Sequence, residues 1–185
     1  LAGGCACGLA AAVRTGAGCS TESGIPDYRG PLTSQRTRNP MTYQEFVRDK
    51  GARRRYWSRS AIGWPKIRHT RPNETHHYIA KLEDAGYLTG VITQNVDGLH
   101  SDAGSRNVVE LHGSLDDVVC LSCRAVRSRA KIQDELEAMN GDWLERYRSS
   151  QYAPDGDAVV PPRASEEFGV PLCTCGGILK PHVVF

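Results

Sequence analysis

The chain has 185 residues, and its 39% share of hydrophobic residues excludes disorder along the whole chain and a collagen-like architecture. Its 23 basic and 21 acidic residues give a net charge of +2, so charge alone predicts no direct nucleic-acid partner and no membrane surface as a partner. No stretch reaches the roughly 18 apolar residues that a membrane helix requires. The first residue is not Met and the last three, Val183-Val184-Phe185, are apolar, so we expect the chain to be a fragment of a longer domain.

The first elements are predicted from an apolar run and a capping pattern. Residues 9–13 form a short apolar run that predicts a buried strand, and this run leads into a turn at Gly16-Ala17-Gly18. Thr42 and Glu45 have the spacing of a capping box, which predicts that a helix begins there.

The middle of the chain alternates between helix and strand. A helix is expected over residues 73–85, where Asn73 can cap the start and Gly86 follows the end. Residues 91–93 and 108–111 are rich in β-branched side chains and predict two strands. This alternation predicts an α/β fold with a mainly parallel sheet, in which ligands bind beyond the carboxyl ends of the strands.

Two further helical segments are expected. The run Arg53-Arg54-Arg55 is interpreted as a solvated helix face, with a phosphate-binding patch as the alternative. Ile132, Leu136 and Met139 share one stripe of a later helix, which we expect to end at Asn140-Gly141.

The glycine-rich segment after the first strand is a candidate phosphate site. Glycines at a strand end allow backbone N–H groups to approach a phosphate closely. The dinucleotide pattern G-x-G-x-x-G is only partly met, because Thr21 stands where the third Gly belongs. A tight turn without a ligand is the alternative.

The two later strands end in polar residues that suit a ligand site. Gln94, Asn95 and Asp97 offer the amide and carboxylate groups that can bind a carboxamide and sugar hydroxyls. An Asx-type turn is the alternative for this segment. His112 follows the second strand, where a neutral imidazole could accept a proton near pH 7 or serve a structural role.

The seven cysteines favour a metal site over a disulfide framework, because their number is odd and four of them form two close pairs. Cys120 and Cys123 have the spacing of a zinc knuckle, whereas Cys173 and Cys175 are separated by a single residue. We expect a structural zinc held by these four cysteines, and a redox pair or no metal are the alternatives. Reduced cysteines indicate an intracellular protein.

Taken together, the motifs resemble those of the sirtuins, the NAD-dependent protein deacylases. The resemblance covers nearly the whole chain in order, and it is carried by residues 16–29, by Gln94-Asn95-Val96-Asp97, by Glu110-Leu111-His112-Gly113, by the two cysteine pairs and by Gly176-Gly177-x-Leu179-Lys180-Pro181. Residues 53–57 with Gly63-Trp64-Pro65, and Ala153-Pro154-Asp155-Gly156-Asp157, resemble the class II branch, which includes a mitochondrial sirtuin.

The resemblance implies a fold and a division of the chain. The fold is a Rossmann-type parallel sheet, incomplete at its C-terminus, with a small zinc-binding module. Residues 1–119 would form the first part of the NAD-binding domain, 120–176 the zinc module, and 177–185 the return to the Rossmann-type domain. The protein would be cytoplasmic if bacterial and mitochondrial if eukaryotic.

The resemblance also assigns roles to individual residues. His112 would be the general base, and Asn95 and Arg29 would also act in catalysis. NAD would be bound by a set of residues from the first two motifs: Gly16, Ala17, Gly18, Ser20, Glu22, Ile25, Pro26, Asp27, Tyr28, Arg29, Gln94, Asn95 and Asp97.

The implied reaction removes an acyl group from a protein lysine. Nicotinamide leaves as the acyl oxygen attacks the ribose, His112 deprotonates a ribose hydroxyl, and lysine and O-acyl-ADP-ribose are the products. The alternatives are protein mono-ADP-ribosyl transfer and an inactive fragment that binds NAD and zinc.

One further pair bears on the acyl group. Tyr56 and Arg59 are three residues apart, so they share one helix face, and they resemble the Tyr-x-x-Arg pair with which some sirtuins bind acidic acyl chains. The alternative is that Arg59 is one more solvated residue in an Arg-rich helix.

Overall fold

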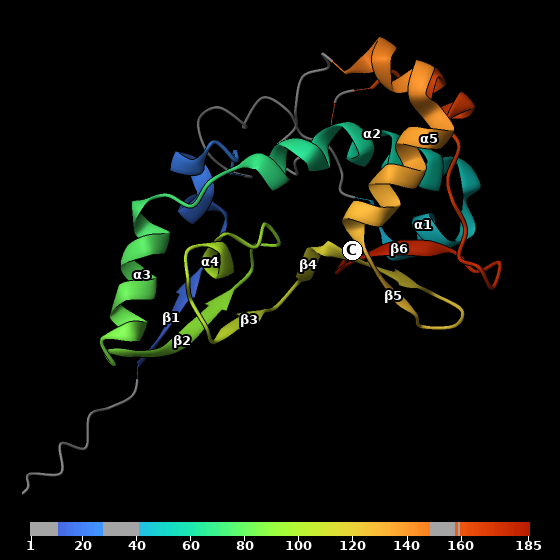
Figure 1. Ribbon diagram of the computed structural model, residues 1–185. Coiled ribbons are helices and arrows are strands. Elements are labelled where there is room, and N and C mark those ends of the chain that lie inside the picture. Colours follow the sequence, from blue (N-terminus) through green and yellow to red (C-terminus); the bar gives the residue numbers. More distant parts are fainter. Residues whose placement is uncertain (1–10, 28–40, 149–157, 159) are drawn as a thin grey trace, which may run out of the picture.

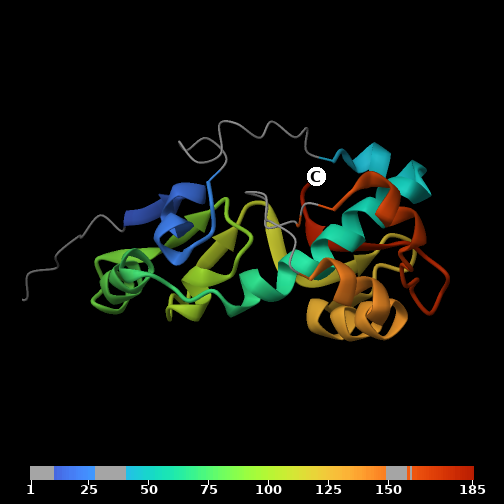
Figure 2. The same cartoon turned by 90° about the horizontal axis from the view of Figure 1, so that it is seen from above.

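The structure is a computed structural model that describes residues 11–27, 41–148, 158 and 160–185. It has two lobes, which are connected by α2 (Lys50–His69) and β4 (Gly113–Cys120) (Figures 1 and 2). Among the described residues, no helix is both long enough and apolar enough to cross a membrane.

The first lobe contains a three-stranded parallel sheet, as predicted, although its first strand is exposed to half-buried and not buried as expected. Its order is β1 (Ala11–Thr15), β2 (Leu88–Thr93), β3 (Val108–Glu110), with Val91 in register with Val13 on one side and Val108 on the other. Parallel strands place their carboxyl ends at one edge. Thr15, Thr93 and Glu110 therefore mark the edge at which the predicted polar motifs begin.

Helix α3 (Glu74–Asp84) packs against β2 and α4 (Leu99–Asp102). The predicted cap is confirmed, because the Asn73 side chain accepts hydrogen bonds from the backbone N–H groups of Thr75 and His76. Gly86 follows the helix with a φ of 79°, a left-handed conformation that favours glycine.

The second lobe contains α1 (Tyr43–Arg48), α2, α5 (Arg129–Tyr147), the 3-10 helix η2 (Pro162–Glu167) and an antiparallel sheet. The sheet order is β5 (Val126–Ser128), β4, β6 (Leu179–Val183). Its core is formed by buried aromatic and aliphatic side chains from these elements and the segments between them, including Phe46, Trp57, Val118, Ile132, Leu136, Phe168 and Leu179. The domain boundaries at residues 119 and 176 stay a prediction.

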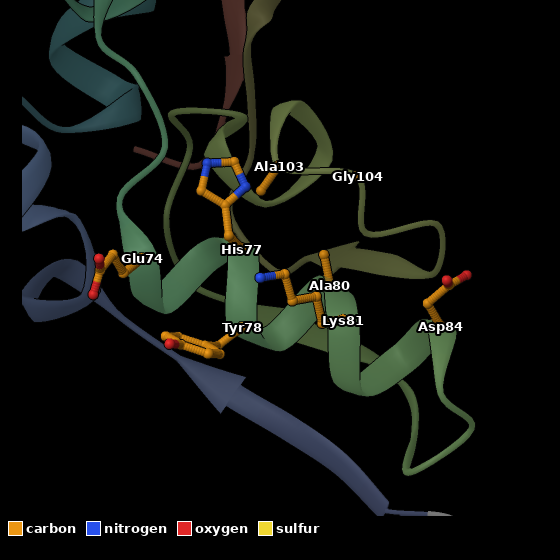
Figure 3. Close-up of a pocket in the computed structure, with 8 residues that line it drawn as sticks. All are labelled: Glu74, His77, Tyr78, Ala80, Lys81, Asp84, Ala103 and Gly104. Atoms are coloured by element: carbon orange, nitrogen blue, oxygen red, sulfur yellow. The ribbon is translucent and has the colours of Figure 1, made fainter.

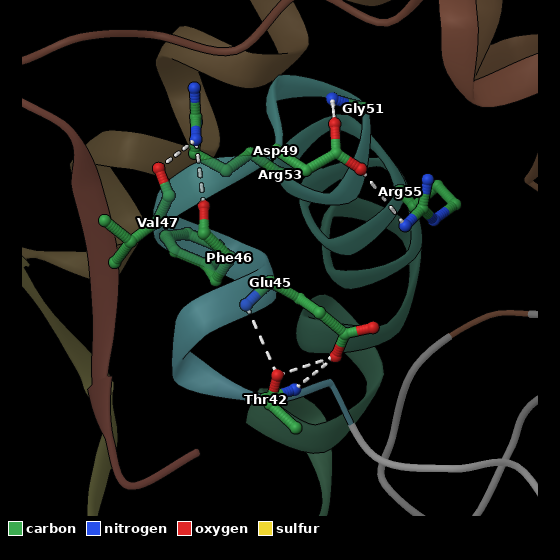
Figure 4. A network of polar contacts seen from close by, with 8 residues as sticks. All are labelled: Thr42, Glu45, Phe46, Val47, Asp49, Gly51, Arg53 and Arg55. Atoms are coloured by element: carbon green, nitrogen blue, oxygen red, sulfur yellow. Dashed lines mark hydrogen bonds and ion pairs between the residues drawn. The ribbon is translucent and has the colours of Figure 1, made fainter.

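The capping box at the start of α1 is confirmed (Figure 4). The Thr42 hydroxyl accepts from the Glu45 backbone N–H, and the Glu45 carboxylate accepts from the Thr42 backbone N–H at 2.9 Å. These bonds satisfy backbone donors that a helix start otherwise leaves without a partner.

The three arginines at 53–55 do not simply form a solvated helix face. Arg55 is exposed and lies 3.6 Å from the Asp49 carboxylate. Arg53, in contrast, donates from Nη1 to the backbone carbonyls of Phe46 and Val47, both at 2.9 Å. The guanidinium therefore satisfies carbonyls at the end of α1, a contact between helices that composition alone does not reveal.

The predicted helix end is present as a break, because α5 consists of two helical segments that meet at Asn140. Asn140 itself is non-helical, with φ −132° and ψ 28°, and a second segment, which the sequence analysis did not expect, continues to Tyr147. The Asn140 side chain donates to the Gly169 carbonyl and accepts from the Gly169 N–H. The second segment buries Trp143, whereas Met139, expected on one stripe with the buried Ile132 and Leu136, is 54% exposed.

Candidate active site

The glycine-rich segment and the second polar motif meet at the carboxyl edge of the parallel sheet. Residues 17–23 form the 3-10 helix η1, preceded by Gly16 in an extended conformation. The Ser20 hydroxyl donates to Asp97 Oδ2 at 2.6 Å, and Asn95 Nδ2 donates to Ser20 Oγ at 3.0 Å. Ser20 and Asn95 are buried. Two motifs that lie about 75 residues apart in the chain are therefore joined by one hydrogen-bond network.

Gln94 connects this network to His112. The Gln94 backbone N–H donates to the Thr15 carbonyl at 3.2 Å, which holds the residue against the end of β1. Its own carbonyl oxygen lies 2.9 Å from His112 Nδ1. A carbonyl only accepts, so Nδ1 carries a proton, and in the neutral imidazole the lone pair is then on Nε2. An exposed imidazole with this Nε2 lone pair can accept a proton from a bound ligand.

The backbone of His112 is held from the other lobe. The Val184 N–H donates to the His112 carbonyl at 2.8 Å, directly after β6. The residues after β6 thus help to position His112, a role that the sequence analysis missed. In the sequence near His112, only the glycine that follows it, Gly113, indicates that another segment approaches the backbone there.

The other predicted cofactor residues of the first motif line the same segment. Gly18 and Glu22 are exposed, whereas Ile25, Pro26 and Asp27 are half-buried. The Ile25 N–H donates to the Ser20 carbonyl at 3.2 Å, which folds the chain back after η1. Two predicted residues, Tyr28 and Arg29, lie outside the described residues.

Two buried histidines lie beneath η1. Burial, together with the nearby His76, lowers the pKa of His100 to about 4. Burial also lowers the pKa of His76. Both imidazoles are therefore neutral at pH 7, and neither was singled out from the sequence.

The four predicted zinc ligands converge in one cluster. The Sγ atoms of Cys120 and Cys175 are 3.6 Å apart, those of Cys123 and Cys173 are 3.7 Å apart, and all four lie within 4.8 Å of one another. Zn–S bonds of about 2.3 Å in a tetrahedron place two sulfurs about 3.8 Å apart, so the distances fit zinc. The single-residue spacing of the second pair does not prevent this arrangement.

The backbone around the cluster supports thiolate ligands. The Cys123 N–H donates to Cys120 Sγ at 3.5 Å, and this bond, with further hydrogen bonds from Ser122 and Cys175, lowers the pKa of the Cys120 thiol, whereas the neighbouring sulfurs raise the pKa of Cys123. A Cβ added to Gly177 would lie 2.6 Å from the same sulfur, so only glycine leaves room for it. The cluster has the donor set and the shape of a structural zinc site.

Tyr56 and Arg59, the candidate residues for binding the acyl chain, have different contacts in the structure. Tyr56 packs in an aromatic group, with ring centroids 5.6 Å from Phe46 and 5.1 Å from Phe185. Arg59 Nε donates to the Ala158 carbonyl at 3.3 Å. Because Phe185 directly follows the residue that bonds to His112, Tyr56 lies close to the candidate active site.

A hollow of about 670 Å³ lies elsewhere, along α3 (Figure 3). His77, Tyr78, Lys81 and Gly104 are among the residues that line it. None of the predicted site residues is in its wall. The hydrogen-bonded network is the better candidate active site, because it brings together groups that can bind a ligand and move a proton.

Comparison with known proteins decides the family. The sequence model described as "Sir2 family" matches residues 16–185. The chain belongs to the Sir2 family. This confirms the resemblance to sirtuins.

Relatives and solved structures agree with this placement. The chain is 50% identical over 177 residues to "NAD-dependent protein deacetylase 1" of Mycobacterium avium, covering 94% of this chain and 62% of that protein. It is 47% identical over 177 residues to "NAD-dependent protein deacylase Sirt4" of Drosophila melanogaster, covering 94% of this chain and 56% of that protein. The Sir2-family chain thus spans about 60% of the length of these relatives.

The fold also matches Sir2 structures. A structure described as "Sir2-p53 peptide-NAD+" is similar with a TM-score of 0.70 and 30% identity, over 96% of this chain and 59% of that one. A structure described as "Sir2 bound to acetylated peptide" is similar with a TM-score of 0.68 and 27% identity, over 96% of this chain and 59% of that one. The predicted α/β fold with a four-cysteine zinc cluster is confirmed for this Sir2-family chain.

Proposed function

We propose that the full-length protein is an NAD-dependent protein deacylase, which removes acyl groups from lysine side chains and yields nicotinamide and O-acyl-ADP-ribose. The proposal is supported by relatives that carry the names of NAD-dependent deacetylases and a deacylase. It is also supported by similar structures that hold a peptide with NAD+ or an acetylated peptide.

The glycine-rich segment fits the cofactor. A Cβ added to Gly18 would meet nothing within 4 Å, so a ligand has open access to the backbone there. Ser23 Oγ is buried without a hydrogen-bond partner among the described residues, which suits a segment that completes its contacts when a ligand binds. Gly16, Ala17, Gly18 and Ser20 would hold NAD from one side. Gln94, Asn95 and Asp97 would hold it from the other.

The bound cofactor supplies a ribose whose bond to nicotinamide can break. The chain's contribution is the position of the groups around it. Asn95, Ser20 and Asp97 are locked to one another, so their remaining donors and acceptors are oriented before a ligand arrives. Such preorganisation reduces the reorganisation required during the reaction.

The observation that carries the proposal is the hydrogen bond between His112 Nδ1 and the Gln94 carbonyl. It fixes the tautomer in which Nε2 can accept a proton from a ribose hydroxyl. It also ties the base to the residue adjacent to Asn95. The zinc cluster lies in the second lobe and stabilises that lobe, without a part in the chemistry.

The substrate would be an acyl-lysine of a protein, and the Tyr56 side of the site would receive it. Tyr56 lies against Phe185, next to the segment that holds His112. We propose that the protein belongs to the class II branch, which the motifs at residues 53–57, 63–65 and 153–157 resemble. Its compartment would be the cytoplasm of a bacterium or the mitochondrion of a eukaryote, where cysteines remain reduced.

Product analysis tests the proposal. Full-length protein is incubated with NAD and peptides that carry acetyl-, succinyl- or longer acyl-lysine, and the products are identified by mass spectrometry. Nicotinamide with O-acyl-ADP-ribose is the expected result. ADP-ribosylated protein without deacylated peptide would assign mono-ADP-ribosyl transfer instead, and no NAD consumption with any peptide would leave only a binding role.

A further inference from the structure

Three potential metal ligands meet beneath the glycine-rich segment, outside the four-cysteine cluster. Cys19 is in η1, His76 is in α3 and His100 is in α4. Each places one ligand atom within 4.8 Å of the other two. The two imidazoles are buried, and Cys19, a free thiol, is half-buried. One thiol and two imidazoles form a donor set suited to Zn²⁺ and similar divalent cations.

The spacing between two of these atoms already suits a metal. Cys19 Sγ lies 3.7 Å from His76 Nε2, within hydrogen-bond distance for sulfur. A tetrahedral zinc with Zn–S near about 2.3 Å and Zn–N near about 2.05 Å would separate these atoms by about 3.6 Å. The cation would therefore fit between Cys19 and His76 with little movement.

The Asn73 side chain offers His76 an acceptor for the tautomer that turns a lone pair toward Cys19. The Asn73 amide is oriented because its Nδ2 donates to the Cys19 carbonyl at 2.8 Å. Nδ1 of His76 accepts from the Asn73 backbone N–H at 3.3 Å and also lies 3.0 Å from Asn73 Oδ1. In the tautomer with the proton on Nδ1, His76 donates to Asn73 Oδ1 in place of the backbone bond and presents the Nε2 lone pair to the cluster.

His100 has the complementary arrangement. The Thr15 hydroxyl donates to Thr93 Oγ1 at 2.8 Å, so it can only accept from His100 Nε2, which is also 2.8 Å away. The proton of His100 is therefore on Nε2, and Nδ1 keeps a lone pair. That Nδ1 is buried without a hydrogen-bond partner among the described residues.

Metal-binding histidines usually donate their other ring N–H to an oxygen, which fixes the tautomer and the ring orientation. Both histidines here have such an oxygen, from Asn73 and from Thr15. We propose that Cys19, His76 and His100 form a second metal site, which takes a Zn²⁺-class cation with a water molecule as the fourth ligand. The bound cation ties η1 to α3 and α4, one residue from Ser20, and so stiffens the glycine-rich segment.

The site is tested by metal stoichiometry, a measurement that does not depend on catalysis. Full-length protein is equilibrated with micromolar free Zn²⁺ in a metal buffer, and bound zinc per chain is measured by mass spectrometry. Wild type should bind two zinc ions. Cys19→Ala should bind one, because it loses the thiolate ligand of the second site. The matched control His77→Ala, which removes the exposed histidine next to His76, should still bind two.

Cobalt gives an independent readout of the ligand. When Co²⁺ is added to protein that carries one zinc, in the four-cysteine cluster, a thiolate-to-cobalt absorption band is expected in wild type and in His77→Ala, and not in Cys19→Ala. A melting curve checks that Cys19→Ala is folded. One zinc in the wild type, or two zinc ions and an unchanged cobalt band in Cys19→Ala, would overturn the proposal.

Discussion

The α-carbon of Gly113 lies against the backbone carbonyl of His182, so that a Cβ built on Gly113 would be 2.0 Å from the His182 oxygen. Gly113 also has a φ of 78°, in the left-handed region. It is the first residue of β4 and pairs with Val183 of β6. This close approach brings the end of β6 to His112, whose carbonyl accepts from the Val184 N–H.

Gly113→Ala should therefore destabilise the protein by more than about 2 kcal/mol, because backbone strain and the clash with His182 add together. Urea unfolding measures the change. Gly104→Ala is the matched control, since Gly104 has a φ of 103° and open space around the added Cβ. Equal losses in the two variants would show that the approach of His182 does not matter.

His112→Ala should abolish deacylation by the full-length protein while NAD affinity stays within a few-fold. The loss of a general base typically reduces the rate by about 10²–10⁴-fold. Single-turnover assays and NAD titration measure the two quantities, and His77→Ala serves as a control histidine. Unchanged turnover in His112→Ala would remove this residue from the mechanism.

Much of the fold could be predicted because the signals were local. The Thr42–Glu45 capping box and the Asn73 cap depend on residues close in sequence, and both are present. The Asn–Gly pair ends the first segment of α5, as such a pair commonly ends a helix. The segment after it could not be predicted, since the kink is held by bonds between the Asn140 side chain and Gly169, almost thirty residues later.

The candidate site divides in the same way. Ser20, Asn95 and Asp97 follow strands whose ends meet at one edge, so their meeting follows from a parallel sheet. The tautomer of His112 depends on the backbone carbonyl of Gln94. Every residue has such a carbonyl, so a sequence motif cannot show which one a histidine will contact. The burial of His100 could not be predicted from its place after the second motif, because it depends on how the surrounding helices pack.

Cys173→Ser should remove the zinc of the four-cysteine cluster and lower the melting temperature. In the wild type, the sulfurs of Cys120 and Cys175 are 3.6 Å apart and those of Cys123 and Cys173 are 3.7 Å apart. The variant removes one of these four ligands and leaves three thiolates to hold the metal. Metal analysis after dialysis against a weak chelator, with a melting curve, checks both effects. Thr174→Ala, which changes the residue between the paired cysteines, should retain the zinc. Full zinc retention with wild-type melting in Cys173→Ser would show that the shortened pair is not a ligand pair.

The hydrogen bonds of the Glu83 carboxylate should make a pH-dependent contribution to the stability of the fold. Its carboxylate accepts from the backbone N–H groups of Arg106 and Asn107, both at 2.9 Å, and the first of these bonds lowers its pKa in the folded state. The ionised form therefore stabilises the fold above the unfolded pKa of about 4.3, and this contribution is lost as the pH falls through the lower folded pKa.

Glu83→Gln should accordingly lower the urea midpoint at pH 7, and the difference from wild type should shrink below about pH 4. Asp84→Asn is the control, because Asp84 is exposed and its ion pair with Arg106 is at the surface. A difference between wild type and Glu83→Gln that stays constant from about pH 7 to about pH 3 would contradict the assigned role of the carboxylate.

The last prediction concerns the acyl group. Arg59 is on the same helix as Tyr56, and a guanidinium can pair with a carboxylate through two parallel hydrogen bonds. Arg59 also donates to the Ala158 carbonyl, so its head group is held close to α2. If it binds the acyl chain, succinyl-lysine should exceed acetyl-lysine in kcat/KM. Arg59→Met should then lose roughly 1.5–3 kcal/mol of transition-state stabilisation with the acidic substrate only.

Arg54→Met, on the same helix, is the control and should leave the ratio of kcat/KM for the two substrates unchanged. A wild-type preference for acetyl-lysine, or an equal loss with both substrates in Arg59→Met, would assign Arg59 to packing against Ala158 and leave the acyl chain to other residues.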